Sequence, residues 1–164
     1  MRICVSCFNC SSMPSSTLYK IKRSVIMDII YPLFTLVILT ITVGFCLGAS
    51  RLFSVKKRHV DRRYYRLMSG YEAPEYVQKI SRNFTNLLEL PILFYVLGVL
   101  TVALNINSSL INALAWGFVS LRLVHSCIHI FYNNPKHRFY SYLFSAIILL
   151  VMWLELIIII SNKT

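Results

Sequence analysis

Four long apolar stretches dominate the pattern of hydrophobic and polar positions along the chain. They cover residues 29–49, 83–104, 110–131 and 139–160. Each is about as long as the ~20 residues that an α-helix needs to cross the hydrocarbon core of a bilayer. The pattern therefore predicts an all-α integral membrane protein, a four-helix bundle that occupies residues 27–164.

The polar segments between these stretches differ in charge. Segment 50–81 carries eight Lys or Arg residues against three acidic ones, and 132–138 is also basic, whereas the short link 105–109 has no charge. Basic loops face the cytoplasm in membrane proteins, so both basic segments are expected on that side. The predicted topology places the N-terminus and the C-terminus outside.

Composition supports the membrane interpretation. Hydrophobic residues make up 57% of the 164 residues, charged residues 14%, and the mean hydropathy is +0.63. The net charge of +11 raises the question of nucleic acid, but basic and aromatic residues do not alternate on any soluble module. Membrane lipids are the expected partner of the basic residues, and no nucleic-acid binding is expected.

Residues 1–26 are too polar for a signal peptide, which needs an apolar core of 7–15 residues. We predict a disordered leader and a native start at Met27, directly before the first apolar stretch. Cys4, Cys7 and Cys10 have a spacing found in iron–sulfur sites. Because a fourth thiolate is missing, free thiols in an unstructured leader are the preferred interpretation.

The second apolar stretch begins with residues that a membrane helix would be expected to avoid: Arg82, Asn86 and Glu89. Steps of four and three residues place all three on one helical face. Ionisable side chains inside a bilayer are costly unless they face other helices or a cavity and find partners there. This face is therefore a candidate functional site.

The third and fourth stretches carry matching polar stripes at the same predicted end of the bundle. The third has Arg122, His125, Ser126 and His129, and the fourth has Arg138, Ser141, Tyr142 and Ser145. The three arginines of these faces, Arg82, Arg122 and Arg138, outnumber the single carboxylate, that of Glu89. This excess of positive charge favours an anionic or zwitterionic ligand, because a guanidinium group binds a carboxylate or phosphate through a pair of hydrogen bonds. The alternative is purely structural, with a Glu89–Arg122 ion pair and interhelical hydrogen bonds as packing contacts.

Other chemistries are less well supported by the residues. His125 and His129 have the spacing of a metal pair, but no third ligand follows in a recognisable pattern, so hydrogen bonding is preferred and no metal site is predicted. Glu155 lies near the outer end of the fourth stretch and is interpreted as a residue that snorkels to, or lies at, the membrane interface. No Ser or Cys is paired in sequence with a base and an orienting acid.

Together these residues resemble the MAPEG family, the membrane-associated proteins in eicosanoid and glutathione metabolism. The resemblance rests on Asn86-x-x-Glu89 followed by Pro91, on Arg122-x-x-His125, and on Arg138 at the start of the last span. It is greatest to bacterial members of unassigned activity, which implies a bacterial inner-membrane location.

The resemblance implies a homotrimer that holds glutathione between neighbouring subunits near the cytoplasmic face. Residues at matching positions in the glutathione-using members contact or support the tripeptide; here these are Asn86, Glu89, Arg122, His125, Arg138 and Tyr142. The resemblance assigns thiol activation to Arg138. Three positions depart from the prostaglandin synthase branch: His129 replaces a tyrosine, Phe139 replaces a serine, and Thr85 replaces a basic residue, with Arg82 one turn earlier as a substitute.

The resulting prediction is a glutathione-dependent transferase or peroxidase that acts on lipophilic electrophiles, with Arg138 as the catalytic residue and glutathione as co-substrate. Arg82 and His129 are included with the residues expected to bind glutathione. The alternative is a non-catalytic membrane protein that binds lipid or a partner in the same crevice between subunits. A third possibility is an assembly protein whose polar stripes only hold helices together.

Overall fold

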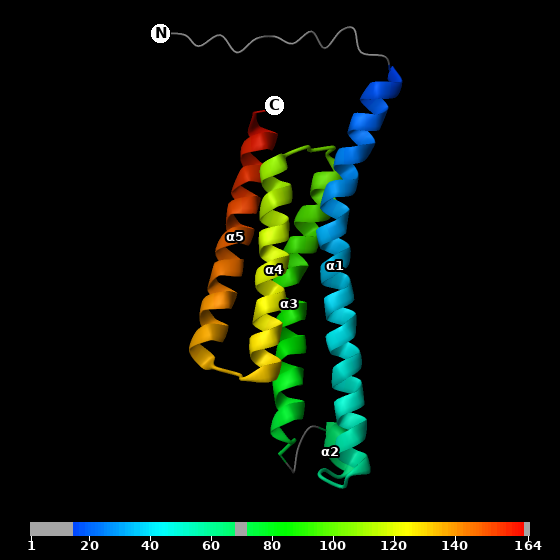
Figure 1. Ribbon diagram of the computed structural model, residues 1–164, viewed down its shortest axis with the longest axis vertical. Helices are drawn as coiled ribbons and strands as arrows, with labels where there is room; N and C mark the ends of the chain where they lie inside the picture. The colour runs from blue at the N-terminus through cyan, green and yellow to red at the C-terminus, as the bar shows by residue number, and fades with distance from the viewer. Residues whose placement is uncertain (1–14, 68–71, 163–164) are drawn as a thin grey trace.

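The computed structural model describes residues 15–67 and 72–162, and these ranges contain five α-helices and no strand. The helices are α1 (Ser15–Lys56), α2 (Arg62–Leu67), α3 (Glu75–Ala103), α4 (Ser109–Phe131) and α5 (Pro135–Ser161). The four long helices stand side by side, and the short α2 lies at the end of the bundle where the chain passes from α1 to α3 (Figure 1). The predicted all-α four-helix bundle is confirmed.

Each predicted apolar stretch lies in one long helix. The segments that are long and apolar enough to span a membrane are Asp28–Lys56, Glu75–Ala103, Ser109–Phe131 and Pro135–Ser161. The helices α1 and α3 run further into the basic segment than the apolar pattern indicates, since α3 begins at Glu75 rather than at residue 83. Lys, Arg, Gln and Glu are good helix formers, so a helix continues beyond its apolar part.

The helix α1 also extends backwards into the segment interpreted as a leader. It begins at Ser15, so residues 15–26 are helical, whereas they were expected to be unstructured. Pro32 consequently lies inside α1 and not in its first turn, a position that membrane helices tolerate. The remainder of the predicted leader, with Cys4, Cys7 and Cys10, lies outside the described residues.

Local sequence explains where the helices of the second half begin. Ser108 caps α4, and its hydroxyl accepts a hydrogen bond from the backbone N–H of Ile111 at 3.3 Å. Asn134 caps α5 and accepts from the N–H of Lys136 at 3.0 Å, while Pro135 occupies the first helical position. Such caps satisfy backbone donors that have no partner inside the helix. The α4–α5 turn is thereby fixed close to the polar residues of both helices.

The apolar core runs through the middle of the bundle. Leu36, Leu87, Phe94, Phe118 and Met152 are fully buried, and the rings of Phe94 and Phe118 stack with centroids 4.7 Å apart. The helix α1 packs mainly on α3, and α4 mainly on α5. Four different helices therefore contribute to one core.

The outer surface of the bundle is also apolar. Large hydrophobic side chains are exposed along all four long helices, among them Phe34, Phe45, Val99, Phe144 and Leu150. A soluble monomer rarely exposes apolar surface on this scale. The surface is suited to contact with lipid, which agrees with an integral membrane protein.

Candidate functional site: a polar pocket between α3, α4 and α5

A pocket of about 340 Å³ opens beside the α4–α5 turn. It is lined by Asn86, Glu89, His125, Pro135, Arg138, Phe139 and Tyr142. Asn86 and Glu89 come from α3, His125 from α4, and the rest from the first two turns of α5. Five residues predicted from the sequence thus meet at one place, because each lies on the face of its helix that points toward the other two.

Asn86 lies at the centre of the hydrogen-bond network. Its Nδ2 atom is 3.1 Å from Nε2 of His129 and 3.5 Å from Nε2 of His125. An amide nitrogen only donates, so both imidazoles accept at Nε2 and are therefore neutral, with their proton on Nδ1. The two predicted histidines act together on one amide group.

His125 extends this network to α5. Its Nδ1–H donates to Oγ of Ser141 at 2.9 Å, and the Ser141 hydroxyl donates to the backbone carbonyl of Arg138 at 3.0 Å. The chain of hydrogen bonds runs from α3 through α4 to the backbone beside Arg138. Ser141 was placed on the polar stripe by the sequence, but its role in holding His125 follows only from the structure.

Arg122 is fully buried behind the pocket. One guanidinium nitrogen, Nη2, donates to the backbone carbonyl of Asn86, and the group lies over the ring of Tyr142 at 5.9 Å from its centroid. Its Nε and Nη1 atoms are buried and have no hydrogen-bond partner. A buried guanidinium group whose donors are only partly satisfied is costly, and an acceptor of negative charge would relieve that cost.

The ion pair between Glu89 and Arg122 that the structural alternative required is absent. Glu89 is exposed at the rim of the pocket, and the ion pair recorded among the described residues joins Lys79 to Glu75 at 2.7 Å. Arg122 instead turns to the backbone of Asn86. The histidine and asparagine hydrogen bonds of that alternative are present.

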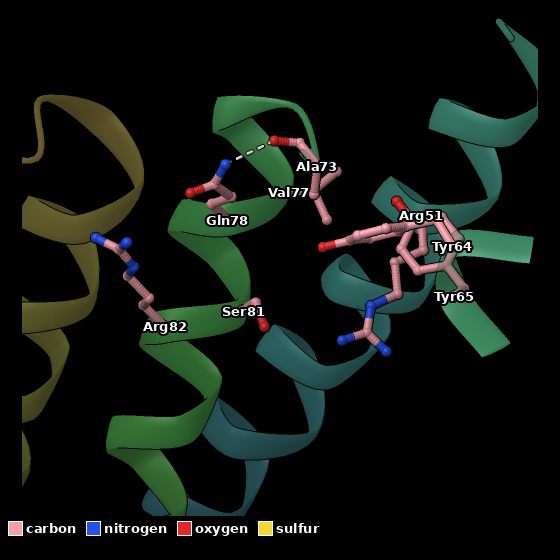
Figure 2. A pocket seen from close by; sticks show the side chains of 8 residues that line it. All are labelled: Arg51, Tyr64, Tyr65, Ala73, Val77, Gln78, Ser81 and Arg82. Carbon is pink, nitrogen blue, oxygen red and sulfur yellow. Dashed lines mark hydrogen bonds between the residues drawn. The ribbon is translucent and has the colours of Figure 1, made fainter. Parts of the chain in front are cut away.

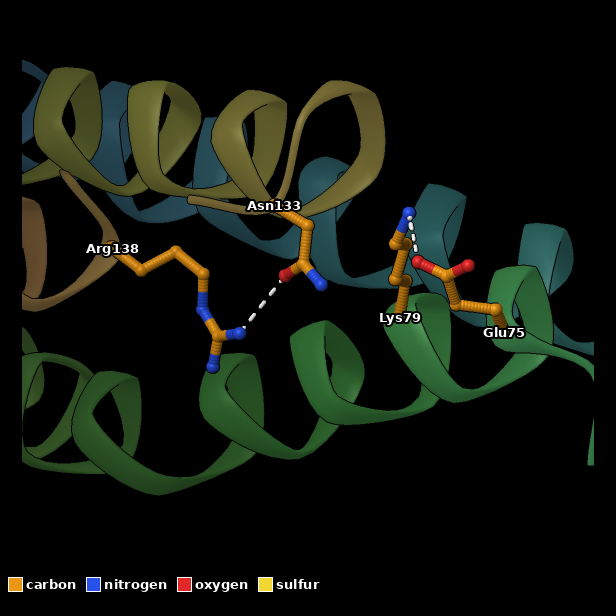
Figure 3. A network of polar contacts seen from close by, with 4 residues as sticks. All are labelled: Glu75, Lys79, Asn133 and Arg138. Carbon is orange, nitrogen blue, oxygen red and sulfur yellow. Dashed lines mark hydrogen bonds and ion pairs between the residues drawn. The ribbon is translucent and has the colours of Figure 1, made fainter. Parts of the chain in front are cut away.

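Arg138 projects from α5 toward α3 (Figure 3). Its Nη1 donates to Oδ1 of Asn133 at 2.9 Å, while its Nε is buried and has no partner. The carboxylate of Glu75 is further along α3 and is held by Lys79. Asn133, in the α4–α5 turn, was not predicted as a site residue. The sequence feature that could have indicated it is an amide in a proline-containing turn shortly before the basic Arg138.

Arg82 is placed differently from the other predicted residues. It is exposed and lines a separate pocket of about 150 Å³ with Arg51, Tyr64, Tyr65, Ala73, Val77, Gln78 and Ser81. Its side chain points away from those residues, toward α4 (Figure 2). It is close enough to act electrostatically on His129 and Arg138, so it contributes positive charge to the site without lining it.

His129 and Asn83 complete the buried side of the site. His129 is fully buried, and its Nδ1 has no partner. Asn83, also fully buried, accepts a hydrogen bond from Ser126 at 3.1 Å and leaves its Nδ2 unpaired. Asn83, which lies one turn before Asn86, was not predicted as a site residue from the sequence.

The described residues hold no cluster of three or more His, Cys, Asp or Glu side chains. Apart from Tyr76 Oη near the start of α3, the buried polar atoms on α3, α4 and α5 without a hydrogen-bond partner are Asn83 Nδ2, Arg122 Nε and Nη1, His129 Nδ1 and Arg138 Nε. With the histidine protons assigned as above, all five of these atoms are donors. This excess of unpaired hydrogen-bond donors suits a ligand rich in hydrogen-bond acceptors, such as one that carries carboxylates.

The fold and the site together define a membrane protein with four spans and a polar pocket between three of them at one end. The sequence profile of the MAPEG family matches residues 29–158, which is most of the chain. The chain therefore belongs to the MAPEG family, as its resemblance predicted. Comparisons with curated proteins and with solved structures gave no match. Membership supports a membrane protein related to glutathione and eicosanoid metabolism.

Proposed function

We propose that the protein binds glutathione in the pocket between α3, α4 and α5 and joins its sulfur to lipophilic electrophiles, or reduces lipid hydroperoxides to alcohol and water while two glutathione molecules are oxidised to the disulfide. The observation that carries the proposal is Arg122, a fully buried guanidinium group with two unpaired donor atoms and no carboxylate of the described residues at ion-pair distance. Family membership supports glutathione over other anions.

The charges around the pocket match the groups of glutathione. The tripeptide has two carboxylates, one ammonium group and one thiol. The donors of Arg122 and the nearby charge of Arg82 suit a carboxylate. The exposed carboxylate of Glu89 at the rim suits the ammonium group. Asn86, held by both histidines, presents its Oδ1 as a further acceptor.

Arg138 is the residue proposed to activate the thiol. It lines the pocket and is fixed by Asn133 on one side and by the first turns of α5 on the other. A guanidinium group beside the thiol favours the thiolate, which is the nucleophile. In conjugation, a sulfur lone pair of the thiolate forms the S–C bond and the leaving group departs with the electron pair of the broken bond. The thiol proton passes to water.

The homotrimer is part of the proposal. The pocket opens at the surface of a single subunit, and Glu89 and Phe139 on its rim are exposed. A neighbouring helix against this rim would close the crevice, exclude water and bring the lipophilic substrate from the bilayer. The proposed location is a bacterial inner membrane with the pocket near the cytoplasmic face.

The test is turnover with glutathione and either an aryl halide or a lipid hydroperoxide. Replacing Arg138 with Ala should lower kcat/KM about 100-fold or more, the usual loss when a group that stabilises developing negative charge is removed. The thiolate absorbance of bound glutathione should disappear as well. The matched control is Lys136→Ala, an exposed cation in the same turn, which should retain turnover.

Subunit number, measured by crosslinking in detergent, must be unchanged in both variants. Unchanged turnover in Arg138→Ala would remove Arg138 from the mechanism. Absence of turnover in the wild type, with glutathione still raising the melting temperature, would favour the alternative of a non-catalytic binder of lipid or a partner. A melting curve that does not respond to high glutathione would favour an assembly role, since a ligand that binds only the folded state must stabilise it.

A further inference from the structure

A chain of three hydrogen bonds links the backbone of Arg138 to the side chain of Asn86. The hydroxyl of Ser141 donates to the carbonyl of Arg138 at 3.0 Å and accepts from Nδ1–H of His125 at 2.9 Å. On the other side of the ring, Nε2 of His125 faces Nδ2 of Asn86 at 3.5 Å, the longest of the three contacts. Ser141 and His125 are buried, and His125 and Asn86 line the pocket. The chain therefore begins in the backbone of α5 and ends where a ligand would bind.

Both ends of this chain have a fixed polarity, because a backbone carbonyl only accepts hydrogen bonds and an amide nitrogen only donates them. Ser141 gives its single hydroxyl proton to the carbonyl, so it meets His125 with a lone pair, and Nδ1 has to carry the ring proton. The reverse arrangement, with Ser141 donating to His125, would leave two acceptor oxygens 3.0 Å apart with no proton between them. Ser141 thus selects one of the two tautomers of the neutral imidazole.

The second imidazole at Asn86 has no comparable support. Nε2 of His129 lies 3.1 Å from Nδ2 of Asn86, but its Nδ1 is buried without a hydrogen-bond partner. Each imidazole takes one N–H of the amide group, so Oδ1 of Asn86 is left for a ligand. The orientation of this amide therefore depends on His125, and through His125 on Ser141.

A neighbouring serine shows what distinguishes Ser141. Ser145, one turn further along α5, is fully buried, and its hydroxyl donates to the carbonyl of Tyr142 at 2.7 Å. Ser141 makes the same local bond to the carbonyl three residues before it, and such bonds are common for serine in helices. Of these two serines, Ser141 is the one whose hydroxyl also meets an imidazole. The contact with His125, and not the local bond, is what sets Ser141 apart.

We propose that Ser141 is a positioning residue, which fixes the tautomer of His125 and thereby orients Asn86 so that its oxygen, and not its NH2 group, meets the ligand. The pocket then offers a hydrogen-bond acceptor at Asn86 in addition to the unpaired guanidinium donors of Arg122 and Arg138. A ligand that fits both carries an ammonium or amide N–H as well as a carboxylate. The choice of ligand group rests on the proposed binding of glutathione, whereas the tautomer of His125 does not.

The first test is solid-state nitrogen NMR of the full-length protein in lipid bilayers, with isotope-labelled histidine and without glutathione. Protonated and bare ring nitrogens give separate resonances, and the signals of His125 are those lost in His125→Gln. In the wild type, Nδ1 of His125 should carry the proton. Ser141→Ala removes the acceptor and should move the proton to Nε2 in a large share of molecules. Ser141→Thr keeps the hydroxyl and should keep the proton on Nδ1, and the matched control Ser145→Ala should leave His125 unchanged.

The second test is glutathione turnover. Ser141→Ala should raise KM for glutathione about tenfold, the loss expected for one buried hydrogen bond. The value of kcat should be unchanged, because Arg138 keeps its guanidinium group and only a binding contact is lost. With 3-mercaptopropionate, an anionic thiol that has no N–H, the same substitution should leave KM unchanged. An equal rise for both thiols, or no rise for glutathione in an active protein, would overturn the selection of an N–H group by Asn86.

The NMR result separates this proposal from the proposed function. If His125 keeps its proton on Nδ1 in Ser141→Ala, the proposal is overturned whether or not the protein turns over glutathione. Equal changes in Ser141→Ala and Ser145→Ala would also overturn it, since loss of a local bond in α5 would then be sufficient. A wild type without glutathione turnover, in which the tautomer still responds to Ser141, would count against the proposed function and support the role of Ser141.

Discussion

At the scale of single residues, Arg122 is a side chain that is costly to bury. It is fully buried, and of its guanidinium nitrogens only Nη2 has a hydrogen-bond partner, the carbonyl of Asn86. Burying a charge without a counter-charge opposes folding. Residues kept for binding often have this property, because the free energy they cost in the empty site is recovered when the ligand arrives.

Replacing Arg122 with Met, which has a similar length and no charge, should stabilise the protein without ligand. We expect a gain of about 1–3 kcal/mol in the free energy of unfolding, because the buried charge is removed, and a loss of stabilisation by glutathione. Thermal unfolding in detergent with and without glutathione measures both effects. Arg82→Met is the control, since Arg82 is exposed and should change the melting temperature little. A lower melting temperature in Arg122→Met would show that Arg122 is mainly structural.

At the scale of helices, two kinds of contact set how the spans pack. One is the capped start of α4, where Ser108 accepts from Ile111 N–H and donates to Oε1 of Glu155 at 3.5 Å. The other is the close approach of α1 and α3 at Gly98, where a Cβ atom would lie 2.7 Å from Leu33. Glu155 is thereby an interhelical residue joining the start of α4 to α5, a contact that the sequence pattern did not predict.

Ser108→Ala should lower the free energy of unfolding by about 1 kcal/mol, the usual cost of losing an N-cap. Combined with Glu155→Ala, it should reveal a coupling of about 0.5 kcal/mol, typical of interhelical hydrogen bonds in membranes. Thermal unfolding followed by circular dichroism measures all four members of the cycle. Ser109→Ala, exposed at the next position, is the control and should be close to neutral. Equal effects at Ser108 and Ser109 would contradict the cap.

Gly98→Ala should destabilise the protein by about 1–3 kcal/mol, because the added methyl group forces Leu33 of α1 to move. Gly48→Ala provides the matched comparison: its methyl group meets nothing within 4 Å. It should be neutral or stabilising by up to about 1 kcal/mol, since alanine favours helix. The same unfolding measurement applies to both variants. If Gly98→Ala is tolerated as well as Gly48→Ala, α1 and α3 do not pack closely there.

At the scale of the whole molecule, the loop between α1 and α3 and the turn between α4 and α5 lie at the same end of the bundle (Figure 1). Both segments are basic, and the opposite connection, 105–108, has no charge. The positive-inside rule therefore predicts that this end faces the cytoplasm. The pocket beside the α4–α5 turn would then face the cytoplasm.

Single cysteines in a variant with all native cysteines replaced by Ala test this orientation. Cysteines at His59 and Lys136 should react with a membrane-impermeant thiol reagent only from the cytoplasmic side. Cysteines at Asn107 and Asn162 should react only from the other side. Labelling of intact cells and of inverted membrane vesicles measures the two sides separately. Reaction of His59 and Lys136 from opposite sides would contradict the arrangement of the helices.

The four spans and most of the pocket could be predicted because both depend on local patterns. A bilayer requires long apolar helices, and polar residues within them must face other helices, which brings Asn86, His125 and Arg138 together. Arg82 could not be placed in this way, because a long, exposed side chain can turn to either side of its helix. The absence of a Glu89–Arg122 ion pair depends on helix rotation, which the sequence pattern leaves open.

Helix length was the second feature that the sequence predicted poorly. Hydropathy marks where a helix is in lipid, whereas hydrogen bonding and helix propensity decide where it ends. The starts of α1 at Ser15 and α3 at Glu75 therefore went undetected. The contributions of Asn83 and Asn133 were missed because amides near helix ends are common and carry no distinctive spacing.

The unequal heights of the helices determine how reactants would reach the pocket. With 29 residues, α3 is about 43 Å long at 1.5 Å per residue, and with 23 residues, α4 is about 35 Å long. At the basic end α3 and α1 project beyond the α4–α5 turn (Figure 1). Under the proposed function, a water-soluble thiol would enter beside the α4–α5 turn, which does not reach as far as the ends of α1 and α3. A hydrophobic substrate would arrive sideways from the membrane. Two compounds that share no solvent would meet at Arg138 from perpendicular directions, so neither would have to leave before the other could enter.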